Sequence, residues 1–333
     1  MNRRDTVLAL LALGAAIAPP HVLAQIRGTG KPFRIGLIPD LLEIRHEQIS
    51  AALRELGWTP GRDFVLFQSG IQYGRDIENS VKRVVDDKPD LIFAANTGYI
   101  LAAHRLTKTI PIVMWSMGYP VEAGLAQSLA RPGGNVTGLS QYAGTQIFGK
   151  LIELLREAKP AIKRIGVLWS YVPPVHPREE IEPAYRDLRE AARLLRVEVR
   201  ILEIDKPEKV KSALAAVVAE RMEALFVTTG APLNPHRQEV MNFAVENGLP
   251  TISDFTWPGI EPQPLLRYSP LPAELIRQAA SYVVRILKDG ARPGDLPIQQ
   301  PARFELVISL KTAKALRLSI PQRLLIRANE LIQ

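Results

Sequence analysis

The fold of this chain is decided by the segment RIGLIPD (residues 34–40), which returns with similar character as RIGVLWS (residues 164–170). Each segment is a short run dense in branched apolar side chains, which is typical of a strand buried on both faces of a parallel sheet. After each of them, apolar runs of strand length alternate with amphipathic stretches of helical period. The sequence therefore predicts two successive sets of alternating strands and helices.

The first set continues with expected strands at 63–69, 90–97, 110–116 and 135–140, and with expected helices at 43–57, 76–87, 99–107 and 121–130. The second set continues with expected strands at 197–204, 224–230 and 249–255, and with expected helices at 178–195, 207–221 and 235–247. Strands that alternate with helices favour parallel sheets with right-handed crossovers. We therefore expect an α/β protein with two doubly wound parallel-sheet lobes.

The pattern changes after Tyr268, where a helix (272–288), a proline-rich passage, a lone strand (303–310) and a final helix from Lys311 are expected. One strand and two helices are too few for a third domain. We expect them to complete the two sheets, so that several segments join the lobes as a hinge. The expected first lobe comprises residues 32–160 and about 268–296, and the expected second lobe comprises residues 161–267 and about 297–333.

The first 24 residues have the three parts of a secretory signal peptide: a basic head with Arg3 and Arg4, an apolar run, and a small-residue exit that ends at Ala24. The apolar run is too short to span a bilayer comfortably. Paired arginines also occur in twin-arginine signals, so both Sec and Tat export fit. The chain has no cysteine, which excludes a lipid anchor at the cleavage point. We expect cleavage near Ala24 and a periplasmic mature protein.

Composition and motifs argue against several classes of function. The formal net charge of +8 is spread along the chain and is not interleaved with aromatic side chains, so a nucleic-acid partner is not expected. The chain has no H-E-x-x-H or G-x-S-x-G motif, and its histidines are scattered. We therefore expect no metal site, no cofactor and no enzymatic activity.

The segment LARPGGNVTGLS (residues 129–140) has the glycines of a phosphate-binding loop but neither the spacing nor the Lys-Ser/Thr ending that such a loop needs. Its Asn-Val-Thr triplet matches a glycosylation sequon, which is common by chance. The segment also leads into an expected strand, whereas a phosphate loop leads into a helix. We interpret it as a turn in which Gly133 and Gly134 allow a positive φ.

Candidate ligand-binding residues lie where the expected strands end, because open α/β sheets bind ligands beyond the carboxyl ends of their strands. Hydroxyl groups beside helix N-termini suit a carboxylate, and aromatic rings suit a planar body or a cation. Each side chain also has a structural alternative, such as a helix cap, lobe-boundary core or plain surface. The candidates are Asp40, Thr97, Gly98, Ser116, Met117 and Tyr119 in the first lobe, and Ser170, Tyr171, Thr228, Thr229, Asp254, Phe255 and Trp257 in the second.

The chain resembles the bacterial ABC-transporter substrate-binding proteins of the tryptophan/tyrosine-type group, which have the type I periplasmic binding protein fold. The segments that carry the resemblance are LRELGWTPGRDF (53–64), TIPIVMWSMGYPVEAGLAQSLARPGGNVTGLS (109–140), RIGVLWS (164–170) and QPARFELVISLKTAKALRLSIP (300–321). The resemblance implies a monomeric receptor that captures a small solute by hinge closure and delivers it to an ABC permease in the inner membrane. Its pocket positions transfer as locations: the turns at Thr97, Ser116–Tyr119 and Tyr171.

Two segments at the implied pocket edges depart from the family pattern: PDLLEIRHE (39–47) is bulky and charged, and GIEPQPLLRYSP (259–270) is rich in proline. The ligand is therefore expected among amino acids, aromatic acids and related organic acids. Arg267 either pairs with a ligand carboxylate or bridges the lobes. Two alternative functions stay open, a periplasmic sensor that presents its solute to a receptor and, less favoured, an enzyme on the same scaffold.

Overall fold

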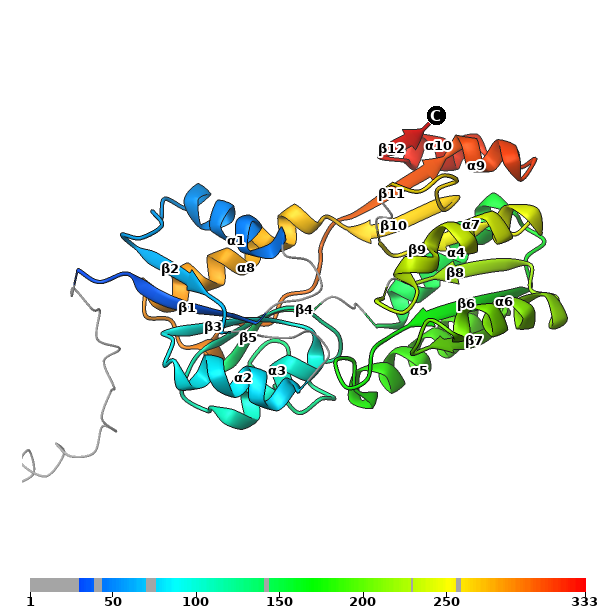
Figure 1. Ribbon diagram of the computed structural model, residues 1–333. Coiled ribbons are helices and arrows are strands. Elements are labelled where there is room, and N and C mark those ends of the chain that lie inside the picture. The colour runs from blue at the N-terminus through cyan, green and yellow to red at the C-terminus, as the bar shows by residue number, and fades with distance from the viewer. Residues whose placement is uncertain (1–29, 39–43, 70–75, 141–143, 229, 256–258) are drawn as a thin grey trace, which may run out of the picture. The chain divides into compact units, whose positions relative to one another are not determined.

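The computed structural model describes residues 30–38, 44–69, 76–140, 144–228, 230–255 and 259–333 (Figure 1). The expected signal peptide lies outside these residues. So do three candidate ligand-binding residues, Asp40, Thr229 and Trp257. None of the described helices is both long enough and apolar enough to cross a membrane.

The first sheet is entirely parallel and has the strand order β2-β1-β3-β4-β5. Its strands are β1 (Phe33–Ile38), β2 (Phe64–Phe67), β3 (Leu91–Ala95), β4 (Ile112–Met117) and β5 (Val136–Ser140). Apolar side chains cover both of its faces. One face packs against α1 (Ile44–Glu55) and α8 (Pro272–Leu287), and the other against α2 (Ile77–Asp86) and α3 (Thr97–Leu106).

The second sheet has the order β12-β11-β10-β9-β8-β6-β7 and is parallel except for the β10–β11 pair. Its strands are β6 (Arg164–Ser170), β7 (Glu198–Ile204), β8 (Ala224–Val227), β9 (Thr251–Ser253), β10 (Leu266–Pro270), β11 (Phe304–Ser309) and β12 (Glu330–Ile332). One face packs against α4 (Thr145–Ala158) and α5 (Arg178–Leu194), and the other against α6 (Lys209–Ala219) and α7 (Arg237–Glu246). The short helices α9 (Leu310–Ala315) and α10 (Gln322–Arg327) lie between β11 and β12. The expected fold class of two parallel-sheet lobes is confirmed.

The chain passes between the two sheets three times, as Figure 1 shows. The first passage joins β5 to α4, and the second joins β10 to α8. The third follows Gln299, which accepts a 2.8 Å hydrogen bond from the Ser140 amide at the end of β5, and leads into β11. Each lobe is therefore built from separate stretches of the chain.

The helix α4 packs on the second sheet, although the sequence placed residues up to 160 in the first lobe. The Phe148 ring lies 6.2 Å from the Trp169 ring on β6 and 6.5 Å from the Phe226 ring on β8, centroid to centroid. An amphipathic helix between two strand sets has no local signal that says which sheet it covers. The apolar cluster shared by α4, α5 and the second sheet shows where the α4 side chains are buried.

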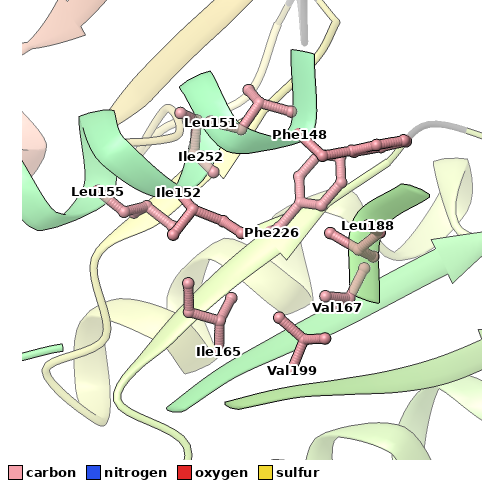
Figure 2. Close-up of a pocket in the computed structure, with 10 residues that line it drawn as sticks. All are labelled: Phe148, Leu151, Ile152, Leu155, Ile165, Val167, Leu188, Val199, Phe226 and Ile252. Carbon is pink, nitrogen blue, oxygen red and sulfur yellow. The ribbon is translucent and has the colours of Figure 1, made fainter. Parts of the chain in front are cut away.

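A pocket in this cluster is lined by apolar side chains alone (Figure 2). They come from α4, α5 and the strands of the second sheet: Phe148, Leu151, Ile152, Leu155, Ile165, Val167, Leu188, Val199, Phe226 and Ile252. The pocket has no polar group that could orient a solute. We therefore assign it to the packing of the second lobe.

The expected helix at 121–130 is wrong, because this segment forms turns. The amides of Ala123, Gly124 and Leu125 bond back to residues 119–121, which makes about one helical turn. Gly124 then has a φ of +73°, which ends any right-handed helix at this point. The apolar spacing of the segment reflects the burial of Leu125 and Ala126.

The turn expected in LARPGGNVTGLS is present, but Gly133 alone of its two adjacent glycines has the expected positive φ. Gly133 has a φ of +78°, and its amide donates a 3.0 Å hydrogen bond to the carbonyl oxygen of Gly294. A Cβ on Gly294 would lie 2.9 Å from the Gly133 carbonyl carbon, so the two backbones touch. The glycines thus allow a close approach of two chain segments that belong to the first lobe.

The strand expected alone at 303–310 has neighbours on both sides. β10 pairs with β11 in antiparallel register, and β12 pairs with it in parallel. The sequence did not predict β10, because the proline-rich passage around it hides a strand. The final helix expected from Lys311 is divided into two short helices, α9, which begins at Leu310, and α10.

We predict that Phe148→Ala destabilises the protein by about 3–5 kcal/mol, because it opens a cavity between α4 and the second sheet. Equilibrium urea denaturation measures this change. The control is Glu153→Ala on the exposed side of α4, which should change the free energy of unfolding by less than about 0.5 kcal/mol. Equal effects of both variants would contradict the placement of α4.

Candidate functional site

The loop between β6 and α5 in the second lobe lies against the first lobe. The amide of Gly98, in the first turn of α3, donates a 2.8 Å hydrogen bond to the carbonyl oxygen of Val175. The Val175 side chain is fully buried in the apolar cluster of the first lobe, with Tyr99 and Ile100. A Cβ on Gly98 would overlap the Pro174 carbonyl oxygen, so this contact requires glycine.

The helix α5 adds a second contact between the lobes. The Tyr119 hydroxyl, just after β4, donates a 3.0 Å hydrogen bond to Asp187 Oδ2 on α5. Burial and the nearby Asp187 carboxylate raise the pKa of Tyr119, so its hydroxyl keeps its proton. Arg186, the neighbour of Asp187, lies 3.7 Å from Glu122 in the first lobe. The Tyr119 hydroxyl, a candidate ligand contact, is therefore engaged at the lobe boundary.

The carboxyl group of Glu180, in the first turn of α5, also faces the first lobe. Burial raises its pKa to about 7, and the Thr97 hydroxyl and the Gly118 amide partly oppose this shift. A glutamate at this helix position often bonds back to the amide of the N-cap residue. Here the N-cap residue is Pro177, which has no N–H, so the Glu180 side chain has no such partner.

Four buried polar atoms, three at strand ends and one on α5, make no hydrogen bond of good geometry to a described residue, although the Thr97 hydroxyl lies close enough to the Glu180 carboxyl group to oppose the rise of its pKa. They are Asn96 Nδ2 and Thr97 Oγ1 after β3, Ser170 Oγ at the end of β6, and Glu180 Oε2 on α5. A buried polar group without a partner costs about 1–3 kcal/mol. Hydrogen-bond donors at strand ends of both lobes and an acceptor on α5 are thus left available.

Two candidate hydroxyls are already used inside the second lobe. The Tyr171 hydroxyl donates a 2.8 Å hydrogen bond to Glu203 Oε2 and accepts one of 3.3 Å from Arg178 Nη2. The Thr228 hydroxyl accepts a 2.9 Å hydrogen bond from the Ser170 amide and donates one of 3.2 Å to the Leu168 carbonyl. These bonds hold the strand ends of the second sheet in place.

The other candidates lie at strand ends. Ser116 and Met117 are the last residues of β4. Asp254 and Phe255 follow β9 and are partly exposed. Desolvation nevertheless raises the pKa of Asp254 to about 7, so protein atoms surround its carboxyl group closely. Sequence reasoning thus found the strand ends but could not say which side chains there were already bonded.

Glu180 was missed by the sequence reasoning. An acidic residue in the first turn of a helix is also what the helix dipole favours, so Glu180 gave no distinct signal. Arg267, for which two partners were considered, lies 3.7 Å from Glu330 within the second sheet. The sequence had suggested either a ligand carboxylate or a residue of the other lobe as its partner. The ion pair with Glu330 instead joins β10 and β12, the two neighbours of β11.

Two α/β lobes, joined by three chain passages and with unpartnered polar groups at their boundary, define a two-lobed binding-protein architecture. Residues 39–332 match the family described as ABC transporter substrate binding protein, and the chain belongs to this family. The resemblance noted from the sequence is confirmed.

Individual relatives agree with this assignment. A tyrosine-binding protein of Clostridioides difficile (strain R20291) is 29% identical over 266 residues, which are 80% of this chain and 74% of that protein. A conserved domain protein from Vibrio cholerae has a similar fold, with a TM-score of 0.78 and 24% identity over 91% of this chain and 99% of that chain. An ABC domain from Streptococcus pneumonia in complex with L-Trp has a TM-score of 0.77 and 22% identity, over 90% of this chain and 100% of that chain.

We predict that Gly98→Ala loosens the contact between α3 and the β6–α5 loop, because the new methyl group overlaps the Pro174 carbonyl oxygen. Peptides that cover Gly98 and residues 171–177 should then exchange amide hydrogens at least about tenfold faster. Hydrogen–deuterium exchange with mass spectrometry measures this. Gly149→Ala in α4 is the control, because a Cβ there meets no other atom within 4 Å. Unchanged exchange in Gly98→Ala would contradict the contact.

We predict that the stability of Glu180→Gln, relative to the unaltered protein, improves as the pH rises from about 4.5 to 7. Burial raises the pKa of Glu180, so the native state favours its protonated form. Below the unfolded-state pKa, the protonated Glu180 side chain contributes fully to the free energy of unfolding. This contribution, on the order of 3 kcal/mol, is lost as the pH rises through about 7. Chemical denaturation at several pH values measures the difference.

Taking the difference between the two proteins cancels the opposite effect of His176. Burial lowers the pKa of His176 to about 4, so this residue costs stability as the pH falls below its unfolded value. Glu182→Gln, on the exposed side of the same helix, is the control for replacing a carboxylate of α5 by an amide. A flat profile for Glu180→Gln would refute the buried position of its carboxyl group.

Proposed function

We propose that this protein captures a small solute between its two lobes and delivers it to an ABC permease in the inner membrane. The observation that carries this proposal is a set of buried polar atoms without a hydrogen bond of good geometry, which come from strand ends of both lobes and from α5: Asn96 Nδ2, Thr97 Oγ1, Ser170 Oγ and Glu180 Oε2. Buried polar groups in native proteins nearly always have partners. A bound solute would supply the missing ones.

The solute is an amino acid, an aromatic acid or a related organic acid. The tyrosine-binding relative from Clostridioides difficile and the structural neighbour in complex with L-Trp support an aromatic amino acid. The partly exposed Phe255 and the desolvated Asp254 carboxyl after β9 add an apolar face and a polar group to the same region. L-tyrosine, L-tryptophan and L-phenylalanine are therefore the first ligands to test.

Capture proceeds by closure of the lobes about the segments that join them. A solute that contacts Thr97 in the first lobe and Ser170 in the second stabilises the closed arrangement more than the open one. The contacts of Gly98 with Val175 and of Tyr119 with Asp187 add to the closed state. The permease would recognise the closed form.

The protein acts outside the cytoplasm as a monomer, with residues 1–24 as its signal peptide. Its partners are a small molecule and a permease, and it binds no nucleic acid. It does not convert its ligand chemically. The solute would therefore be returned unchanged after binding.

Isothermal titration calorimetry of the mature chain with the three aromatic amino acids tests the proposal. We expect one site per chain, a higher melting temperature with ligand, and a smaller radius of gyration by X-ray scattering. Recovery of unaltered ligand after long incubation tests the absence of turnover. Stoichiometric binding without compaction would contradict hinge closure. No binding to any amino acid or organic acid would contradict the function.

We predict that Ser170→Ala weakens solute binding by about three- to tenfold and leaves the melting temperature nearly unchanged. The Ser170 hydroxyl has no partner in the described structure, so its removal costs the protein alone no hydrogen bond. One neutral hydrogen bond to the ligand accounts for the expected change. Calorimetric titration gives the affinity and thermal unfolding gives the stability.

The matched comparison is Thr228→Val, which removes a hydroxyl that is bonded twice within the second lobe. This variant should lose about 1–3 kcal/mol of stability. If Ser170→Ala is destabilised to the same extent, the Ser170 hydroxyl has a structural role and is not a ligand contact.

A further inference from the structure

We propose that Glu203 is a positioning residue for lobe closure: it holds both ends of the loop between β6 and α5 and thereby controls how tightly the solute is retained, without contacting the solute. This role rests on the closure mechanism proposed above and makes it more specific. Glu203 lies near the end of β7, a strand at the edge of the second sheet. The loop is residues 172–177, with Tyr171 before it and Arg178 after it.

The Glu203 carboxylate bonds to both residues that flank the loop. The Tyr171 hydroxyl donates a 2.8 Å hydrogen bond to Glu203 Oε2. Arg178, the first residue of α5, donates from Nη1 to Oε1 and from Nη2 to Oε2, each at 3.1 Å. Arg178 Nη2 also donates a 3.3 Å hydrogen bond to the Tyr171 hydroxyl, so the three side chains are bonded to one another. One carboxylate thus fixes the separation of the two ends of the loop and has both of its oxygens occupied.

The loop itself is stiff. The His176 amide donates a 2.9 Å hydrogen bond to the Val172 carbonyl oxygen, and the Val172 amide donates one of 3.2 Å to His176 Nδ1. Three of the six loop residues are prolines, whose rings restrict φ. At the entry to the loop, the Tyr171 amide donates a 3.1 Å hydrogen bond to the carbonyl oxygen of Ile204, next to Glu203 on β7. A stiff loop with fixed ends moves as one body with those ends.

The tip of this loop is where the second lobe meets the first. The Val175 side chain is buried in the apolar cluster of the first lobe, and the Val175 carbonyl oxygen accepts the hydrogen bond from the Gly98 amide. Val172 packs against the same cluster. A shift of the loop ends therefore reaches the contact with the first lobe. Because this contact belongs to the closed state, loosening it lowers the closed fraction and with it the apparent affinity.

The alternative is that Glu203 and Arg178 form an ordinary surface ion pair, which would contribute little. Three observations favour the positioning role. The pair is bidentate, the Glu203 side chain is only 32% exposed, and the Tyr171 hydroxyl joins the pair. The hydrogen bonds from Arg178 hold the pKa of Glu203 below its usual range although burial opposes this shift, so the carboxylate is charged at neutral pH.

Hydrogen–deuterium exchange of the solute-free mature chain tests the positioning role directly. In Glu203→Gln, peptides that cover residues 171–177 and Gly98 should exchange at least about fivefold faster, because the amide lacks the charge that binds Arg178. The matched control is Glu182→Gln, which removes the other carboxylate partner of Arg178 and should leave both peptides unchanged. Unchanged exchange in Glu203→Gln, or an equal increase over the whole chain, would overturn the positioning role.

The second measurement follows binding of L-tyrosine, L-tryptophan and L-phenylalanine by stopped-flow fluorescence. For each amino acid that binds, we expect Glu203→Gln to weaken the affinity about three- to tenfold through faster dissociation, with the association rate constant within about twofold of the original. A residue that only stabilised the fold would not change the dissociation rate. An unchanged dissociation rate, or an equal loss of affinity in Glu182→Gln, would refute the control of solute retention by Glu203.

A milder variant keeps the test decisive if Glu203→Gln does not fold. Tyr171→Phe removes one hydroxyl and with it two of the hydrogen bonds, and it should speed exchange of the Gly98 peptide at least about twofold. Unchanged exchange of that peptide would then count against Glu203. If none of the three amino acids binds to the unaltered protein, the proposed function fails, whereas the solute-free exchange still decides whether Glu203 positions the loop.

Discussion

The contact between the N-terminal turn of α3 and the β6–α5 loop is the constraint on which the arrangement of the lobe boundary depends. It joins backbone to backbone through Gly98 and Val175 and buries the Val175 side chain in the core of the other lobe. Because the loop leads directly into α5, it also sets where the first turn of that helix lies. Glu180 and Asp187 reach the strand ends of the first lobe from this helix.

The polar groups at the boundary divide into two kinds. Some are bonded within or between the lobes, such as Tyr171 to Glu203 and Tyr119 to Asp187, and they hold the strand ends and the helix in position. Others are buried and unpartnered in the described structure, such as Ser170 Oγ and Glu180 Oε2. The unpartnered groups are already removed from water and held in place by the fold. A complementary solute could therefore bind to them without a further desolvation cost or rearrangement of those groups.

Much of the architecture could be predicted from the sequence, since buried parallel strands are apolar throughout and their helices have a clear period. The two sets of strands, the turn at Gly133 and the family were found in this way. The segment 121–130 misled the prediction because its apolar spacing serves the burial of turn residues. The strand β10 was hidden by prolines, and the lobe to which α4 belongs had no local signal.

By itself, the sequence determined the two parallel sheets and the family, and it located the strand ends at which we propose that a ligand binds. Only the tertiary structure decided which side chains at those strand ends already have hydrogen-bond partners within the protein. Ser170 and Thr228 both place a hydroxyl group at the end of a strand. The Thr228 hydroxyl makes two hydrogen bonds within its lobe, whereas the Ser170 hydroxyl has no partner among the described residues. Glu180 looked like an ordinary first-turn acid until folding placed it against the other lobe. The reason is physical: strand and helix periods are local properties, whereas hydrogen-bond satisfaction and desolvation depend on residues far away in the chain.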